Sequence, residues 1–479
     1  TVSRLGFGGY RVDDETPEHR EALIAALQAG CTLIDTSTNY TDEGSERLVG
    51  SVLAELTDDG RVPRDAVVVV SKIGYVQGEN LALAQEREAA GKPFPEMVKY
   101  MDGCWHCLHP EFLRDQLTRS LDRLRQETLD VCLLHNPEYF LSDAKQRPAS
   151  GGLETLREEF SRRLREAFAF FETQVAAGRI GWYGVSSNTA VAPPDDPEAT
   201  SLSRMLEAAR TAVGPGHHFR VLQVPMNLFE AGAVLAPNTG PDGTRTVLEL
   251  AAEAGIGLLV NRPLNAFVGG QLVRLADFHP KEEAVEASPD EPLRQVAALE
   301  EEYRTRIASR LQAPQGGTPP ADWFRWADQL RTLPGHLQGL DHWRQIEEQM
   351  IAPMVAQLVH MLDGRLTGPM AGSWQDWRDR YLPVLDSLLQ VFRVQAARLS
   401  QATSDAVAAA LTPHLPLLRA GESLSRKALW ILASTPGVSC VLLGMRHPAY
   451  VSDGMAIHGW PPLRDVRPIY EAMRQVQVG

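Results

Sequence analysis

Short runs of β-branched residues alternate with longer amphipathic segments on both sides of one long interruption. This alternation predicts parallel strands joined by helical crossovers. The strands are expected at 4–10, 31–37, 66–72, 129–135, 180–187, 219–225, 255–261 and 438–444. Helices are expected between them at 17–29, 45–56, 111–126, 153–177, 199–212, 245–254 and 423–433. These repeats predict an α/β fold, a TIM-type (β/α)8 barrel. An open doubly wound sheet would alternate in the same way, but no G-x-G-x-x-G motif follows the first strand.

The interruption, residues 276–421, divides the predicted barrel into a first part, 1–275, and a closing part with a C-terminal tail, 422–479. It contains helical patterns near 291–311, 341–362 and 382–411, together with Trp323, Trp326, Trp343, Trp374 and Trp377. These tryptophans offer enough apolar area for a separate core, so we expect an inserted α-helical subdomain. A connection that leaves the C-terminal end of a barrel strand emerges on the catalytic face. The insertion is therefore either a lid over the pocket or a packing or dimerisation element.

The chain carries a formal charge of −14, which argues against a general nucleic-acid binder because such proteins usually present a basic face. No apolar run approaches the roughly 18 residues needed to span a bilayer, and the start of the chain shows no signal segment. The 5 cysteines are too few and too scattered to cross-link so long a chain. We therefore expect a cytoplasmic protein without nucleic-acid or membrane partners, and the oligomeric state stays open.

Four residues at strand ends, or in the loops just after them, form a candidate catalytic set: Asp35, Tyr40, Lys72 and His135. A phenol with a pKa of about 10 is a poor acid at neutral pH. A neighbouring ammonium would lower that pKa by stabilising the phenolate, and a buried carboxylate would hold the ammonium in place. The phenol could then protonate a carbonyl oxygen while hydride reaches the carbon, with His135 as a second donor to that oxygen. Each residue alone also has a structural explanation, and their joint placement after strands two, three and four favours catalysis.

The segment "CWHCLH" (104–109) packs two cysteines and two histidines into a short stretch. A tetrahedral zinc site normally needs a second, distant ligand pair, and the sequence offers only scattered histidines for that role. We therefore expect no metal. Because the segment follows the third strand, Trp105 and His106 are predicted to line the substrate pocket together with Tyr10, unless they serve packing alone.

Six motifs stand in an order and at spacings that resemble the aldo-keto reductase family: "LIDTSTNY", "VVVVSKIG", "LDVCLLHNPE", "GRIGWYGVSSN", "LQVPMN" and "VLLGMRHPAYV". The resemblance covers about 1–275 and 422–460, with the insertion between barrel strands seven and eight outside it. It implies Tyr40 as general acid/base, Lys72 as the group that lowers its pKa, Asp35 as the partner of Lys72, and His135 as the group that orients the substrate oxygen. It also implies a nicotinamide cofactor bound across the barrel mouth.

The same resemblance implies a set of cofactor-binding residues. Ser186, Asn188 and Gln223 match the positions that hold the nicotinamide carboxamide, although "GVSSN" leaves open whether Ser187 or Asn188 makes the second contact. Asn261 stands where the family often has a stacking aromatic residue. The remaining members are Arg262, which could meet the cofactor phosphates, Leu264, and Gly444 with Arg446, which resemble the loop that meets the adenosine 2′-phosphate. The adenine-binding Glu-Asn pair of the family appears as Asp453-Gly454, yet NADP(H) remains the expected cofactor.

Three functions are consistent with these observations. The first is reversible hydride transfer between NADPH and a small carbonyl or alcohol substrate. The second is an NAD-dependent sugar or polyol dehydrogenase that works mainly in the oxidative direction. The third is a barrel kept as a cofactor-sensing scaffold or regulatory subunit, against which the intact set of four candidate catalytic residues argues.

Overall fold

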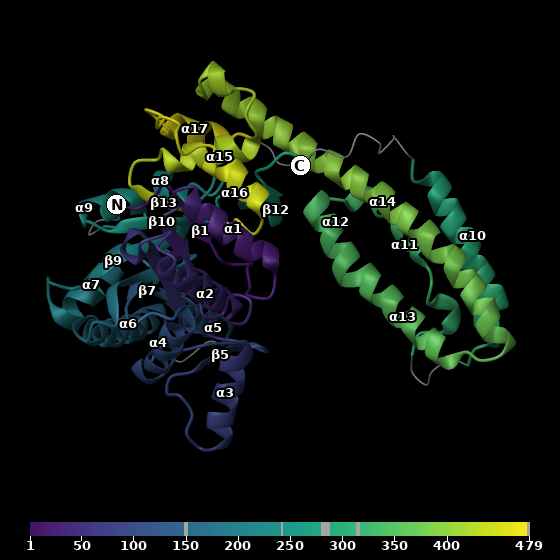
Figure 1. Ribbon diagram of the computed structural model, residues 1–479, viewed down its shortest axis with the longest axis horizontal. Coiled ribbons are helices and arrows are strands. Elements are labelled where there is room, and N and C mark those ends of the chain that lie inside the picture. Colours follow the sequence, from purple (N-terminus) through teal and green to yellow (C-terminus); the bar gives the residue numbers. More distant parts are fainter. Residues whose placement is uncertain (148–151, 241–242, 279–287, 313–316, 477–479) are drawn as a thin grey trace. The chain divides into compact units, whose positions relative to one another are not determined.

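The computed structural model describes residues 1–147, 152–240, 243–278, 288–312 and 317–476 (Figure 1). The chain forms two compact units. The first unit combines Thr1–Ala266 with His414–Gln475, and the second contains Phe267–Pro413. The second unit thus begins and ends somewhat earlier than the predicted insertion 276–421.

The first unit is a closed barrel of parallel strands in the order β1-β13-β10-β9-β8-β7-β3-β2. The strands are β1 (Leu5–Gly8), β2 (Leu33–Asp35), β3 (Val68–Ile73), β7 (Leu129–His135), β8 (Ile180–Ser186), β9 (Phe219–Pro225), β10 (Gly257–Asn261) and β13 (Val438–Leu443). The barrel closes between its first and last strands, where Leu5 lies opposite Val441. Each strand overlaps a predicted run, and the predicted (β/α)8 barrel is confirmed.

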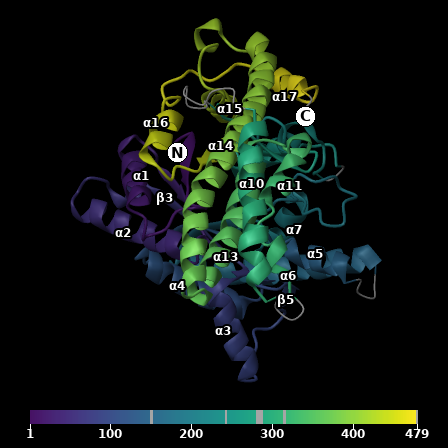
Figure 2. The ribbon, with the colours of Figure 1, turned by 90° about the vertical axis from the view of Figure 1, so that its right-hand side faces the viewer.

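Helices cover the outside of the barrel (Figures 1 and 2). They include α1 (Pro17–Gln28), α2 (Gly44–Asp58), α4 (Pro110–Leu124), α6 (Gly152–Ala176), α7 (Leu202–Val213), α9 (Val247–Glu253), α15 (Leu424–Ala433) and α16 (Pro448–Met455). The first seven overlap predicted helices. Thr16 occupies the N-cap position before Pro17, but its side chain makes no capping hydrogen bond.

The barrel core follows from two sequence patterns. Helix α4 buries the stripe Phe112, Leu117, Leu121 and Leu124, which recurs at helical spacing. The strands fill the barrel with the buried side chains Leu33, Val70, Val131, Leu133, Leu259, Cys440 and Leu442. A Leu133→Ala change would remove about 2–5 kcal/mol of stability because the closed barrel cannot collapse around the missing atoms. This rigid core holds the C-terminal strand ends in place.

Several short elements of the first unit were not predicted from the sequence. A three-stranded antiparallel sheet contains β4 (Tyr75–Val76), β5 (Val98–Met101) and β6 (Cys104–His106). The segment "CWHCLH" therefore begins as a strand. The Asp102-Gly103 pair that joins β5 to β6 is a typical hairpin signal, with Gly103 at φ +76°. The short helices α3 (Gly78–Ala89), α5 (Tyr139–Gln146), α8 (Gly232–Leu235) and α17 (Arg467–Met473) complete this unit.

The second unit starts with a hairpin, β11 (Asn265–Val268) and β12 (Gln271–Arg274), whose first residues still belong to the barrel unit. Its turn is Gly269-Gly270, both at positive φ, a sequence that typically joins hairpin strands. The helices that follow are α10 (Asp290–Arg306), α11 (Trp326–Arg331), α12 (Leu340–Ile346), α13 (Ala352–Arg365) and α14 (Pro369–Leu411). The sequence predicted one helix over 341–362, but a π-helical turn, Glu347–Ile351, separates α12 from α13.

The second unit has its own hydrophobic core, built largely from aromatic side chains. Helix α14 runs for 43 residues, far longer than the predicted 382–411. It continues in the N-terminal direction past Pro383 because Trp374, Trp377 and Tyr381 extend its buried stripe. The buried Glu300 of α10 accepts hydrogen bonds from Tyr381 Oη at 2.9 Å and from the backbone N of Trp326 at 2.8 Å. The N-terminus of α11 is thereby capped from a neighbouring helix.

Candidate active site

The four predicted catalytic residues meet at the C-terminal ends of neighbouring barrel strands. Asp35 ends β2, Lys72 is the penultimate residue of β3, and His135 ends β7. Tyr40 follows in the loop after β2. Because parallel strands of a closed barrel end on the same face, positions far apart in sequence come together there.

Lys72 is the centre of this group and its side chain is 0% exposed. Its Nζ donates hydrogen bonds to Asp35 Oδ2 at 2.7 Å, to Thr36 O at 2.9 Å and to Tyr40 Oη at 2.9 Å. These three acceptors use all three protons of the ammonium. The buried cation is therefore fully satisfied, and the Tyr40 hydroxyl is held as an acceptor beside it.

Burial is the largest cause of the pKa shifts of Tyr40 and Lys72. It raises the pKa of Tyr40 well above its usual value, and the nearby Asp35 carboxylate raises it further. This direction is opposite to the lowering by Lys72 that the sequence predicted, because removal from water destabilises the phenolate. Burial also lowers the pKa of Lys72, while Asp35 opposes that shift. Tyr40 consequently keeps its proton at neutral pH and is available as an acid.

His135 is oriented by a neighbouring hydroxyl. Its Nδ1 and Ser37 Oγ are 2.9 Å apart, within hydrogen-bond distance. Burial lowers the pKa of His135 well below its usual value, and the Lys72 cation lowers it further, so the ring is neutral. The neutral ring carries one proton, on Nε2 when Ser37 donates to Nδ1 and on Nδ1 when Ser37 donates to Asn39 Oδ1, 2.8 Å away, instead. The rings of His135 and Tyr40 meet edge to face with centroids 5.8 Å apart.

Gln223 connects the predicted cofactor residues to this group. Its Nε2 donates to Asp35 Oδ1 at 2.7 Å, and its Oε1 accepts from Ser186 Oγ at 3.0 Å and from Asn261 Nδ2 at 3.3 Å. Asn261 Oδ1 is buried and has no hydrogen-bond partner among the described residues. An unused acceptor in this position suits the N–H groups of a primary amide. The residues present therefore fit a nicotinamide carboxamide.

The structure separates the two candidates in the run "GVSSN". Ser187 is buried and its hydroxyl lies 2.6 Å from Thr200 Oγ1, so it belongs to a hydroxyl cluster. The side chain of Asn188 is exposed at the end of β8, and its backbone N donates to Glu138 Oε1 at 2.7 Å. Of the two, Asn188 has the side chain available for a ligand.

The predicted phosphate residues lie in two loops. Arg262, at φ +54°, forms an ion pair with Glu230 at 3.0 Å, so its charge is partly neutralised, and Leu264 beside it is half-buried. Gly444 and Arg446 are exposed between β13 and α16. A Cβ at Gly444 would meet no atom within 4 Å, so close packing does not account for this glycine. Asp453, which stands at the predicted adenine-binding position, accepts a hydrogen bond from Ser425 Oγ at 2.7 Å.

The predicted substrate residues divide into two groups. Tyr10 is 61% exposed and packs edge to face on Tyr40 with ring centroids 5.2 Å apart, and Trp105 is half-buried beneath Lys99. His106 is wholly buried, contrary to the expectation that it lines the pocket. Its Nε2 donates to His135 O at 2.7 Å and its ring stacks on Tyr139. It thus supports the strand end that carries His135.

Other buried groups beside His135 were not predicted from the sequence. Tyr75 packs edge to face on His135 with ring centroids 4.6 Å apart, and its hydroxyl accepts a hydrogen bond from Asn136 Nδ2 at 2.9 Å. Glu138 is buried in the turn after β7. The polar residues of "HNPE", directly after an apolar strand, are the signal that could have indicated Asn136 and Glu138. The described residues contain no group of three or more His, Cys, Asp or Glu side chains that could hold a metal ion.

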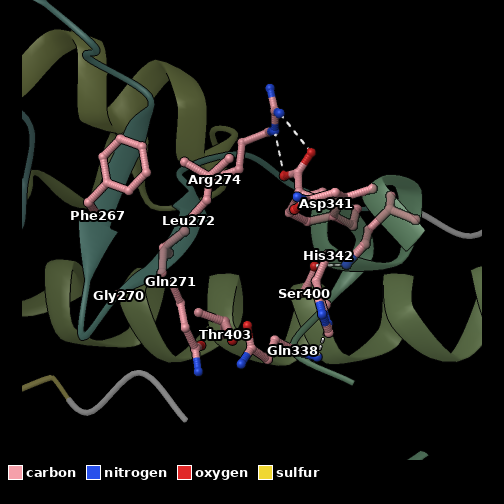
Figure 3. A pocket seen from close by; sticks show the side chains of 15 residues that line it. Phe267, Gly270, Gln271, Leu272, Arg274, Gln338, Asp341, His342, Ser400 and Thr403 are labelled. Carbon is pink, nitrogen blue, oxygen red and sulfur yellow. Dashed lines mark hydrogen bonds and ion pairs between the residues drawn. The ribbon is translucent and has the colours of Figure 1, made fainter. Parts of the chain in front are cut away.

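A separate hollow of about 290 Å³ lies within the second unit, between β12 and the start of α12 (Figure 3). Gln271, Gln338 and Thr403 gather on one side of it. On another side Arg274 and Asp341 form a two-pronged ion pair at 3.0 and 2.8 Å. This pairing neutralises the strongest charges of the wall, and none of the predicted site residues belongs to it.

The Aldo/keto reductase family profile matches residues 4–327. The NADH-specific methylglyoxal reductase of Escherichia coli (strain K12) is 28% identical over 143 residues, 28% of this chain and 38% of that protein. The NADPH-dependent D-xylose reductase of Meyerozyma guilliermondii is 27% identical over 137 residues, 28% of this chain and 32% of that protein. The chain thus matches only about a third of the length of these relatives.

Among solved structures, the holo form of the aldo-keto reductase AKR11C1 from Bacillus halodurans aligns with 100% of this chain and 94% of its own, at 14% identity and a TM-score of 0.47. In the described residues, no helix has the length and apolar character needed to cross a membrane.

Proposed function

Because the chain belongs to the aldo/keto reductase family, a family of oxidoreductases that use nicotinamide cofactors, we propose that it reduces the carbonyl group of a small substrate with NADPH, and that Tyr40 donates the proton. One observation carries this proposal. A wholly buried Lys72 bonds Asp35 and Tyr40 at once, next to a neutral His135.

Tyr40 is suited to act as the acid. Its raised pKa keeps the phenol protonated, while Lys72 Nζ at 2.9 Å stabilises the negative charge that develops on Oη as the proton leaves. Asp35 neutralises Lys72 and fixes its position at 2.7 Å. A neutral His135 with its proton on Nε2 can donate to the substrate oxygen, and it carries no charge that would compete with Lys72.

The proposed cofactor-binding residues would hold the nicotinamide in place. Ser186, Gln223 and Asn261 would hold the nicotinamide carboxamide, and Asn261 would make a hydrogen bond where the family often stacks an aromatic ring. When bound, the nicotinamide supplies the hydride for the carbonyl carbon. Arg446 would meet an adenosine 2′-phosphate through its planar guanidinium. The exposed Tyr10 and the half-buried Trp105 would contact the substrate.

The relatives support a small carbonyl compound as substrate but divide on the cofactor. The name of one specifies methylglyoxal and NADH, and that of the other specifies D-xylose and NADPH. The preference for NADPH in this chain rests on Arg446. The NADH-specific relative keeps an NAD-dependent dehydrogenase or reductase as the second candidate.

The proposal is tested by following the oxidation of NADPH and of NADH in the presence of small aldehydes, ketones and aldoses. We expect turnover with at least one carbonyl class and a larger kcat/KM with NADPH. Binding of either cofactor without turnover of any carbonyl or alcohol would contradict an enzymatic role and favour a cofactor-sensing scaffold.

A further inference from the structure

Glu138 lies in a turn that continues the pairing of β7 with β8 past the ends of both strands. Asn136 N donates to Ser186 O at 2.7 Å, and Glu138 Oε1 then accepts from Asn188 N at 2.7 Å. A side-chain oxygen thus replaces the next backbone carbonyl of the ladder. The contact joins the turn that follows His135 to the segment Ser186–Asn188, at the edge of the proposed carboxamide site.

The carboxyl group of Glu138 is poorly compensated for a buried acid. The residue is 4% exposed, and its Oε2 is buried without a hydrogen-bond partner among the described residues. A carboxylate can accept about four hydrogen bonds, so a bare oxygen adds to the cost of removing the charge from water. A buried carboxyl group in this state takes up a proton at a higher pH than one that is paired with a cation.

Among the described residues, none of the groups that face Glu138 is a cation. They are Glu198 from the loop before α7, the phenols of Tyr75 from β4 and Tyr139 from α5, and the Ser187 hydroxyl from the end of β8. Glu198 is acidic and is itself paired with Lys145 at 3.0 Å. Burial, with a smaller contribution from Glu198, raises the pKa of Glu138 to about 7, against hydrogen bonds that lower it.

We propose that Glu138 is a positioning residue for the nicotinamide cofactor. The Glu138 carboxylate fixes the Ser187–Asn188 backbone, and protonation of Glu138 loosens that backbone. This inference rests on the proposed function. Charge-assisted hydrogen bonds are about twice as strong as neutral ones, so the ionised form holds Asn188 N–H more firmly. Dinucleotide affinity should therefore rise as the pH increases through the neutral range.

The test is a titration of NADP⁺ and NAD⁺ by quenching of protein fluorescence at several pH values between about 6 and 8, a range that spans the pKa of a protonatable group near neutrality. The wild-type protein should bind about 5-fold more tightly at the upper end, the scale of the difference between a charged and a neutral hydrogen bond. Glu138→Gln keeps an acceptor oxygen for Asn188 and removes the titration, so its affinity should not change with pH. NAD⁺ has no 2′-phosphate that could titrate in the same range.

A second variant locates the titrating group. Glu198→Gln removes the neighbouring negative charge, so the midpoint of the wild-type pH profile should move to lower pH. His135 is not the source of the profile, because its pKa lies well below its usual value. Identical pH profiles for wild type and Glu138→Gln, or a flat profile for wild type, would overturn the inference while leaving the proposed function intact. Failure of the wild-type protein to bind either dinucleotide at any pH would overturn both.

If Glu138→Gln does not fold, hydrogen exchange on the wild-type protein decides the matter. The protection factor of the Asn188 amide should be lower at the lower pH than at the upper pH. That of the Asn136 amide, which bonds to a backbone carbonyl, should stay constant. Equal behaviour of the two amides would overturn the inference.

Discussion

Gln223 Nε2 donates a hydrogen bond to Asp35 Oδ1 at 2.7 Å. Through this contact the proposed carboxamide site and the Lys72–Tyr40 pair form one continuous hydrogen-bonded network. A change at Gln223 should therefore affect both cofactor binding and the catalytic residues.

The variant Gln223→Leu tests this coupling. It removes a donor from a buried carboxylate, which costs about 1–3 kcal/mol. We expect cofactor affinity and kcat each to fall by about 10-fold, the scale of 1.4 kcal/mol. Ser186→Ala is the matched control, since it removes a partner of Gln223 but leaves Asp35 bonded, and it should weaken cofactor binding with a smaller effect on kcat. Equal loss of kcat in both variants would contradict the coupling.

Arg446 should determine the choice of cofactor. A charge-assisted contact to a 2′-phosphate contributes about 1.5–3 kcal/mol, so Arg446→Ala should weaken NADPH binding by about 10- to 150-fold and leave NADH binding almost unchanged. Arg464→Ala, another exposed arginine of the same unit, serves as the control. Equal losses for both cofactors would indicate a structural role for Arg446.

The barrel could be predicted because its strands are buried β-branched runs of adequate length, separated by helices with a clear apolar stripe. The grouping of the proposed catalytic residues could be predicted because Asp35, Lys72 and His135 are polar residues at the ends of such strands, and strand ends in a barrel share one face. The sequence also indicated that the interruption is helical and rich in buried tryptophan.

Other features depend on tertiary contacts that have no local pattern. Strand β4 has only two residues, too few for an alternation to be visible. The burial of His106 behind His135 follows from the antiparallel sheet that β6 joins. The direction of the Tyr40 pKa shift could not be predicted either, because it depends on how deeply the folded chain buries the phenol.

His106 should make stability depend on pH. Burial lowers its pKa to about 4, from an ordinary value of 6.5. As the pH falls from 6.5 to about 4, the unfolded chain takes up a proton at this histidine and the folded chain does not, so the free energy of unfolding decreases by about 3 kcal/mol. Denaturant unfolding at each pH should show this decrease in the wild type and a smaller one in His106→Gln. Parallel curves for the two proteins would contradict the assignment.

The second unit provides a test of the lid hypothesis. Its separate aromatic core predicts that replacing Phe267–Pro413 with a short Gly/Ser linker leaves a barrel that still binds cofactor. If the unit supplies substrate contacts, kcat/KM for the true substrate should fall about 10-fold or more, while small generic aldehydes are affected less. Unchanged substrate selectivity would indicate that the second unit is a packing or dimerisation element instead of a lid. If the shortened chain does not fold, hydrogen exchange on the intact protein should show protection of this unit mainly when substrate is added.

The central claim, that Tyr40 is the proton donor, is tested most directly by the turnover of Tyr40→Phe on a reducible carbonyl compound. The variant keeps the ring but loses the hydroxyl that Lys72 holds at 2.9 Å. Turnover should fall by about 10² or more while cofactor affinity is retained. Tyr183→Phe, which removes a buried phenol bonded to Glu172, should keep wild-type turnover. Near-wild-type turnover in Tyr40→Phe would contradict the account.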